Sequence, residues 1–135
     1  MDTQREKLKK STLENYVEEK NLAPLKTKTS YKDFDALDIQ VAEIIEAKKV
    51  EKTKKLMRLT VRLDGEERTI VSGIAKDFDE EELIGKKVSL LVNLKPRKLK
   101  GIESQGMILL GENSKGNFVF IGPEDKTIPS GTLIK

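Results

Sequence analysis

Short stretches in which apolar and polar residues alternate dominate the chain from about residue 31 onward. Alternation of period two marks residues 39–47, 58–63, 67–72 and 87–93. Two apolar runs of strand length follow at residues 107–110 and 118–121, separated by a turn at residues 111–116. Because such patterns place one face of a strand against a core, they predict a mainly β domain.

Two local signals refine the first three strands. The alternation changes phase at Ile44-Ile45, which predicts a bulge or a sharp coil in the first strand. Asp64-Gly65 separates two alternating runs and predicts a tight hairpin turn, because glycine tolerates the positive φ that such a turn requires. A two-residue loop would place Arg62 opposite Glu67.

A single short helix interrupts the strands. Asp77 is expected to cap it, acidic residues fill the first turn at 80–82, and Gly85 is suited to the left-handed position after its end. The order is then three strands, a short helix and two strands, followed by a C-terminal hairpin. This order predicts a five-stranded OB-fold barrel, whose ligand face is formed by strands 2 and 3 and flanked by the 1-to-2 and 4-to-5 loops.

The first 30 residues differ from the rest. They are polar, and Leu13, Tyr16 and Val17 fall at the spacing of a short, marginal helix before a Pro-containing linker. The predicted organisation is therefore an N-terminal helix and linker at residues 1–30 and an OB-fold domain at 31–135. A disordered tail is the alternative for residues 1–30.

The chain contains neither cysteine nor histidine. This composition excludes zinc sites, thiol chemistry and Ser-His triads, and predicts no metal and no other cofactor. The sequence also lacks an apolar run of membrane-spanning length and the apolar region of a secretory signal, so a cytoplasmic location is expected.

Positive charge is concentrated in the C-terminal part. Residues 84–135 carry nine lysines and arginines against four acids, and no acid lies between Glu82 and Glu103. Both loops that flank the OB ligand face are basic, at residues 48–55 and 93–105, and Arg58 and Arg62 would lie between them. The coincidence predicts a basic cleft that contacts phosphates, with the stretch 85–100 as its main part.

Neutral polar residues in the same region could discriminate between ligands. Asn93, Ser104 and Gln105 have donors and acceptors suited to base edges or 2′-hydroxyls, whereas capping of loop backbone groups is the alternative for Ser104. The chain has no Trp, two Tyr and four Phe, too few for a platform that stacks successive bases. A folded RNA recognised by shape and backbone is therefore the expected ligand.

The segment 93–109, Asn-Leu-Lys-Pro-Arg-Lys-Leu-Lys-Gly-Ile-Glu-Ser-Gln-Gly-Met-Ile-Leu, closely resembles the hallmark of a known family. This is the tRNA-binding domain found at the C-terminus of methionyl-tRNA synthetases and in stand-alone structure-specific tRNA-binding proteins. The resemblance extends upstream through 38–42, Lys55-Leu56, 68–75 and 81–86. It covers about residue 31 to the C-terminus.

The resemblance implies a non-catalytic OB-fold homodimer that grips the outer corner of tRNA and assists a methionyl-tRNA synthetase in cis or in trans. The ATP-binding signatures of a synthetase are absent, so the chain is not expected to be an enzyme. The resemblance and the charge pattern together predict a tRNA-binding set: Lys55, Arg58, Arg62, Asn93, Lys95, Arg97, Lys98, Lys100, Ser104, Gln105 and Met107. The family's C-terminal dimerisation implies an interface of Phe118, Phe120, Ile121, Ile128 and Leu133.

Two other functions fit the same resemblance. Relatives with this fold resemble export-related chaperones that hold peptides in an apolar groove. A purely structural dimerisation module, without affinity for RNA, is the third hypothesis.

Overall fold

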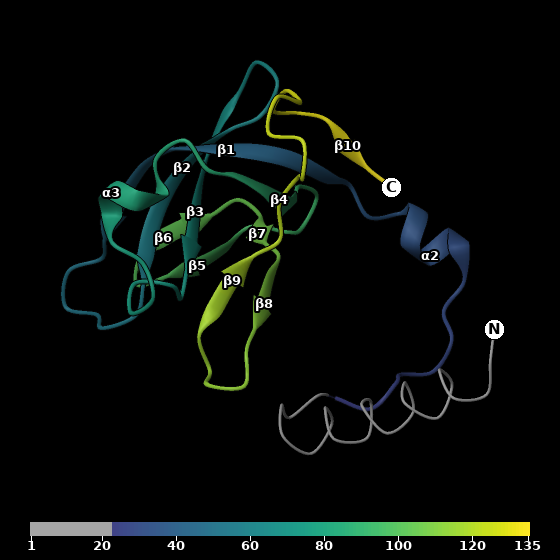
Figure 1. Ribbon diagram of the computed structural model, residues 1–135, viewed down its shortest axis with the longest axis horizontal. Helices are drawn as coiled ribbons and strands as arrows, with labels where there is room; N and C mark the ends of the chain where they lie inside the picture. Colours follow the sequence, from purple (N-terminus) through teal and green to yellow (C-terminus); the bar gives the residue numbers. More distant parts are fainter. Residues whose placement is uncertain (1–22) are drawn as a thin grey trace, which may run out of the picture.

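The computed structural model describes residues 23–135, which form a curled β-sheet with two small hairpins attached (Figure 1). The sheet has the order β3-β2-β1-β4-β7, and β10 also pairs with β1. The strands are β1 Ile39–Lys49, β2 Met57–Arg62, β3 Glu67–Ser72, β4 Lys87–Leu91, β5 Arg97–Leu99, β6 Ile102–Ser104, β7 Met107–Ile108, β8 Leu110–Glu112, β9 Phe118–Phe120 and β10 Leu133–Ile134. The helices are α2 Tyr31–Asp35 and α3 Glu80–Leu83. The predicted mainly β fold is confirmed.

The first three strands form an antiparallel meander. The β1–β2 register shifts between Ile44 and Glu46, which confirms the bulge expected from the change of phase. Around the β2–β3 turn, Leu63 N–H donates to Glu66 O at 2.8 Å and Gly65 takes φ +76. Arg62 lies opposite Glu67, as predicted.

Helix α3 is present, but the prediction of its cap was wrong. Asp79 is the N-cap, and its backbone N–H donates to Glu82 Oε1 at 2.7 Å. Asp77 instead accepts from Asn117 Nδ2 at 2.7 Å and from the backbone N–H of Phe118 at 3.3 Å. The Asp77 carboxylate, which the local spacing assigned to the helix, is therefore hydrogen-bonded to the β8–β9 hairpin. Gly85 has φ +88, as its predicted position requires.

Hydrogen bonds from β3 to Ser104, the last residue of β6, and to Gln105 after it close the curled sheet into a barrel. Gln105 N–H donates to Thr69 O at 2.8 Å, and the Gln105 side chain accepts from Thr69 N–H at 2.9 Å. Ser104 Oγ accepts from Val71 N–H at 3.0 Å. These bonds supply partners to backbone groups of β3 that would otherwise lie at a sheet edge.

The predicted 4-to-5 loop is largely a β-hairpin. Arg97 pairs with Ser104, Lys98 with Glu103, and Leu99 with Ile102. The turn residues Lys100 and Gly101 have φ of +52 and +79, and positive φ at both central positions is typical of a type I′ turn. The sequence predicted a basic connection at 93–105 but not the hairpin within it, because strands of three residues give too short an alternation to recognise.

The predicted C-terminal hairpin is formed by β8 and β9. Phe118 and Phe120 pack against the core, and the Phe78 and Phe120 ring centroids lie 4.7 Å apart. The extension after β9 is tied to β4, because Ser89 Oγ donates to Ile121 O at 2.7 Å. The apolar run predicted at 107–110 is divided between β7 and β8.

At the other end of the domain, α2 begins after its N-cap, Ser30, whose hydroxyl accepts from Asp33 N–H at 3.1 Å. The helix predicted around Leu13, Tyr16 and Val17 lies outside the described residues. No helix within 23–135 is long and apolar enough to span a membrane.

The barrel interior is filled by aliphatic side chains from every long strand. Its fully buried members include Ile44, Met57, Leu59, Ile70 and Leu90. In β2 the buried residues alternate with the exposed Arg58 and Arg62, so the core fixes which side chains of β2 face outward.

Gly106 provides a test of how tightly the barrel closes. It has φ +143, and a Cβ at this position would lie 2.9 Å from Leu91 O and 3.3 Å from Ile70 Cδ1. We expect Gly106→Ala to lower the free energy of unfolding by at least about 1–3 kcal/mol, since strain and a backbone clash add. Gly73→Ala is the control, because nothing lies within 4 Å of its Cβ. Urea denaturation that showed equal effects would contradict a tightly packed closure.

Candidate nucleic-acid interface

The β5–β6 hairpin presents its cations on two different faces. Directly paired residues of an antiparallel hairpin lie on the same face, so Arg97 shares a face with Ser104, and Lys98 shares the other with Glu103. Arg97 and Lys98 are both exposed. The hairpin therefore does not form one uniformly positive surface, and an acid accompanies Lys98 on its face.

The opposite wall is the connection between β1 and β2, which is ordered by its own backbone. Val50 N–H donates to Leu56 O at 3.0 Å, and Thr53 Oγ1 donates to Val50 O at 2.8 Å. Lys55 O accepts from Ala75 N–H at 2.9 Å, which ties the loop to the segment after β3. The lysines at the end of β1, 48 and 49, and those of the connection, 52, 54 and 55, are exposed.

The two walls meet at a hollow of about 290 Å³. Its lining combines the end of β1 and the start of the β1–β2 connection with one residue from β2 and one from the hairpin: Lys48, Lys49, Val50, Glu51, Arg58 and Ile102. Arg58 thus lies between the walls, at the position predicted for it. The fold brings together two basic segments about 50 residues apart in the sequence.

Arg62 lies in a different electrostatic environment from Arg58. Its neighbour on β1 is Glu43 and its neighbour on β3 is Glu67, so it stands between two acids on one face of the sheet. Opposite charges across strands are favourable, and they balance this arginine locally. The structure therefore separates two arginines that the sequence pattern grouped together.

The three polar residues predicted to discriminate between ligands use their polar atoms within the protein. Asn93 Oδ1 accepts from Asp38 N–H at 2.8 Å, and its Nδ2 donates to Ala36 O at 2.8 Å. Ser104 is only 3% exposed, and its hydroxyl both accepts from Val71 N–H and donates to Gly106 O. The Gln105 side chain is likewise hydrogen-bonded to Thr69, so all three side chains connect distant segments of the protein to one another. For Ser104, direct contact with a ligand conflicts with its burial.

The remaining predicted residues are exposed. They comprise Lys55, Lys95, Lys98 and Lys100, together with Met107, which is 42% exposed on β7. Lys95 lies in the connection from β4 to β5, and Lys100 lies in the hairpin turn. Their side chains are accessible to a large ligand.

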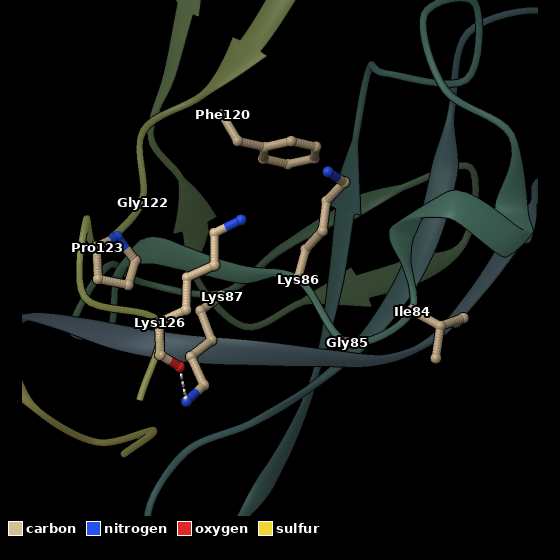
Figure 2. A pocket seen from close by; sticks show the side chains of 8 residues that line it. All are labelled: Ile84, Gly85, Lys86, Lys87, Phe120, Gly122, Pro123 and Lys126. Atoms are coloured by element: carbon tan, nitrogen blue, oxygen red, sulfur yellow. Dashed lines mark hydrogen bonds between the residues drawn. The ribbon is translucent and has the colours of Figure 1, made fainter. Parts of the chain in front are cut away.

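The acid-free stretch 85–100 does not form a single surface, contrary to the prediction. Lys86 and Lys87 lie at a separate hollow of about 450 Å³, beside Phe120 and Lys126 (Figure 2). Lys86 Nζ lies 5.9 Å from the Phe120 ring centroid, and Lys87 Nζ donates to Lys126 O and Ile128 O at 2.8 and 2.6 Å. Strand β4 crosses the barrel between these two lysines and the β5–β6 hairpin, so the lysines and the hairpin lie at different parts of the surface.

One carboxyl near this second hollow has a shifted pKa. The Thr127 hydroxyl and then the Thr127 backbone N–H donate to Asp125, at 2.6 and 2.9 Å, and lower the pKa of its carboxyl. Desolvation opposes the shift, and Lys87 adds to it. The turn at 125–127 is thus stabilised by an ionised carboxylate.

Arg68 is a structural residue that the sequence did not single out. Its Nη1 donates to Val92 O at 2.6 Å and to Gln105 O at 3.3 Å, and its Nη2 lies 3.1 Å from Glu66 Oε1. Arg68 lies in β3 opposite Val61 of β2. Nothing in the local sequence indicated that its side chain bonds to these distant carbonyl groups. Within residues 23–135 no group of three potential metal ligands was found.

The strand order and the closure between β3 and the Ser104–Gln105 segment define an OB-type barrel, a class that carries ligands on the face of strands 2 and 3. A family model described as "Putative tRNA binding domain" matches residues 39–132. The chain belongs to this tRNA-binding domain family.

Named relatives agree with this assignment. The chain is 46% identical over 134 residues to a methionine–tRNA ligase of Christiangramia forsetii, covering 99% of this chain and 19% of that protein. It is 39% identical to a MetRS related protein from Pyrococcus horikoshii, with a TM-score of 0.76, over 82% of this chain and 100% of that one. The chain spans about a fifth of the length of the curated ligases that it matches.

A further structural neighbour shows the fold alone. The chaperone CsaA from Bacillus anthracis is 24% identical, with a TM-score of 0.73, over 81% of this chain and 100% of that one.

The burial of Ser104 leads to a direct test of its role. We expect Ser104→Ala to lower the free energy of unfolding by about 1–3 kcal/mol, because the Val71 N–H loses its partner in a buried position. Affinity for tRNA under conditions where the variant stays folded should be unchanged. Ser114→Ala, at the exposed β8–β9 turn, is the control. An unaltered denaturation midpoint combined with weaker binding would assign Ser104 to the ligand instead.

Proposed function

We propose that this chain is a non-catalytic module that binds folded tRNA through its shape and phosphate backbone. The observation that carries the proposal is the hollow at which the basic β1–β2 connection, Arg58 and the hairpin meet. Among residues 23–135, the one ion pair within 4 Å joins Arg68 to Glu66, so the described acids leave the cations of this cleft available. Phosphate groups are the ligand that such an arrangement favours.

The internal bonding of the polar residues supports recognition of the backbone rather than of bases. Asn93, Ser104 and Gln105 hold backbone groups of the protein, which leaves lysine and arginine as the principal cleft donors. No aromatic residue lines the hollow between the two walls. Sequence-tolerant contact with a structured RNA fits this chemistry better than threading of stacked bases.

In this proposal the module adds binding energy to a methionyl-tRNA synthetase, in cis as part of a longer chain or in trans as a partner. The ligase activity belongs to the catalytic region of such an enzyme. The cytoplasm, where tRNA is aminoacylated, is the proposed location.

Combined replacement of Lys95, Arg97 and Lys98 by alanine tests the hairpin wall. We expect affinity for tRNA to fall about tenfold or more and the log–log salt slope to become shallower, since each lost phosphate contact removes about 0.7–0.9 from the slope. The matched control replaces three exposed lysines elsewhere, Lys28, Lys32 and Lys115. Filter binding at several salt concentrations gives both quantities, and equal losses in the two triple variants would refute a localised cleft.

Competition distinguishes shape recognition from plain electrostatics. Folded tRNA should displace labelled tRNA more effectively than denatured tRNA or duplex DNA does, at both low and moderate salt. A protein that suppressed aggregation of an unfolded client, and bound tRNA no better than other polyanions, would contradict the proposal and favour a chaperone.

We also propose that the chain forms a homodimer through its C-terminal extension. Phe118 and Phe120 of the predicted interface pack on the core of their own chain, which leaves less of their surface for a partner, and Ile128 is half-buried. Ile121 and Leu133 are 52% and 54% exposed and are the members of the predicted interface most available to a partner.

The dimer is tested by Ile121→Glu. Burying a carboxylate in an apolar interface is costly, so we expect the variant to sediment as a monomer at micromolar concentration while the unmodified chain sediments as a dimer. Ile84→Glu is the control, since Ile84 is 50% exposed outside the predicted interface. A monomeric unmodified chain would overturn the proposal.

A further inference from the structure

Two cations lie directly opposite each other on the outer face of the barrel. Lys48 of β1 pairs with Arg58 of β2 across the antiparallel ladder, and both side chains are exposed. Paired residues project to the same side of a sheet, with Cβ atoms about 5 Å apart. Like charges in this position repel one another, so the sheet is less stable here than a neutral pair would make it.

The same face of the sheet avoids such repulsion elsewhere. Two pairs along the ladder, on the same face, Glu46 lies opposite Thr60, whose hydroxyl lies 3.5 Å from the carboxylate. Farther along, Arg62 stands between Glu43 and Glu67. The cross-strand neighbours along β2 therefore include an acid at Thr60 and at Arg62 but none at Arg58, and no acid of residues 23–135 lies within ion-pair distance of Lys48, Arg58 or Arg62.

The pair also lines two surface hollows. Lys48 and Arg58 line the hollow of about 290 Å³ that reaches Ile102 of the hairpin. They also line another hollow, of about 470 Å³, that reaches Ile84. Both hollows have apolar residues beside the cations, and each also has one carboxylate, that of Glu51 in the smaller hollow and that of Glu46 in the larger. A ligand that crossed the cleft would thus meet two neighbouring cations, with apolar residues and one carboxylate on each side.

We propose that Lys48 and Arg58 form a phosphate-binding subsite, in which one backbone phosphate of the RNA bridges the two side chains and relieves their repulsion. The guanidinium of Arg58 can donate two parallel hydrogen bonds to a phosphate, and the Lys48 ammonium supplies a compact charge beside it. The apolar flank at Ile102 and Val50 is suited to the adjoining ribose. This subsite rests on the proposed function. It adds Lys48 to the predicted tRNA-binding residues and assigns one phosphate to Lys48 and Arg58 together.

The carboxylate of Glu51 restricts where the phosphate lies. Glu51 lines the smaller hollow together with the pair, and it repels an anion from the loop side. Glu46 lines the larger hollow with the pair in the same way, so the proposed phosphate lies between the two carboxylates, directly at Lys48 and Arg58.

Single and double replacements, Lys48→Gln and Arg58→Gln, test the shared ligand. We expect each single variant to weaken tRNA binding about three- to tenfold and the double variant to weaken it by less than the product of the two, because both side chains contact one phosphate. The log–log salt slope of the double variant should be shallower than that of the unmodified chain by about 0.7–0.9, which is the contribution of one phosphate contact. Lys115→Gln, in the β8–β9 turn, is the matched control and should stay within twofold of the unmodified chain.

Thermal denaturation without RNA supplies an independent readout. In low salt, Arg58→Gln should melt at the temperature of the unmodified chain or up to a few degrees above it, and this difference should vanish in high salt because the repulsion is screened. Inorganic pyrophosphate should raise the Tm of the unmodified chain more than that of the variant. A lower Tm of Arg58→Gln in low salt would overturn the inference and assign the pair a structural role.

The outcomes separate this inference from the proposed function. If the unmodified chain does not bind tRNA, the proposed function fails. If it binds and the hairpin triple variant loses affinity, while Lys48→Gln and Arg58→Gln keep the original affinity and slope, the phosphate subsite alone is refuted.

Discussion

The hydrogen bonds between β3 and the Ser104–Gln105 segment are the constraint on which the rest of the molecule depends. Ser104 Oγ and the Gln105 main chain and side chain supply partners to Val71 and Thr69, and they close the sheet into a barrel. Because Ser104 is also the last residue of β6, the same bonds fix the hairpin against β3. Core closure and placement of the basic hairpin therefore depend on the same set of bonds, and the two Gln105–Thr69 bonds still hold the hairpin when the Ser104 hydroxyl is removed.

Charge is arranged on this frame at the level of the sheet register. The bulge in β1 sets which of its residues lie opposite Arg58 and which lie opposite Arg62. As a result, one arginine of β2 faces a lysine and the other faces a glutamate. A net charge of only +3 thus coexists with a locally uncompensated site, because distribution rather than total charge determines the surface potential.

Features with a local cause could be predicted from the sequence. The alternation of β2, the bulge, the Asp64-Gly65 turn and the Arg62–Glu67 register depend on neighbouring residues, and the structure confirms them. The candidate site was predicted less completely, because side-chain partners are distant. Asn93 bonds to a residue 55 positions away and Ser104 to one 33 positions away. Asp77 was likewise assigned to the helix although Asn117 and Phe118 hold it.

The type I′ turn at Lys100 and Gly101 has a consequence for the thermodynamics of binding. A flexible basic loop would lose backbone freedom when it contacted a ligand, and that loss would reduce affinity. The β5–β6 ladder orders these residues during folding of the protein instead. The hairpin thus meets its ligand as a rigid projection with cations on both faces, so that association requires ordering of side chains but little rearrangement of the backbone.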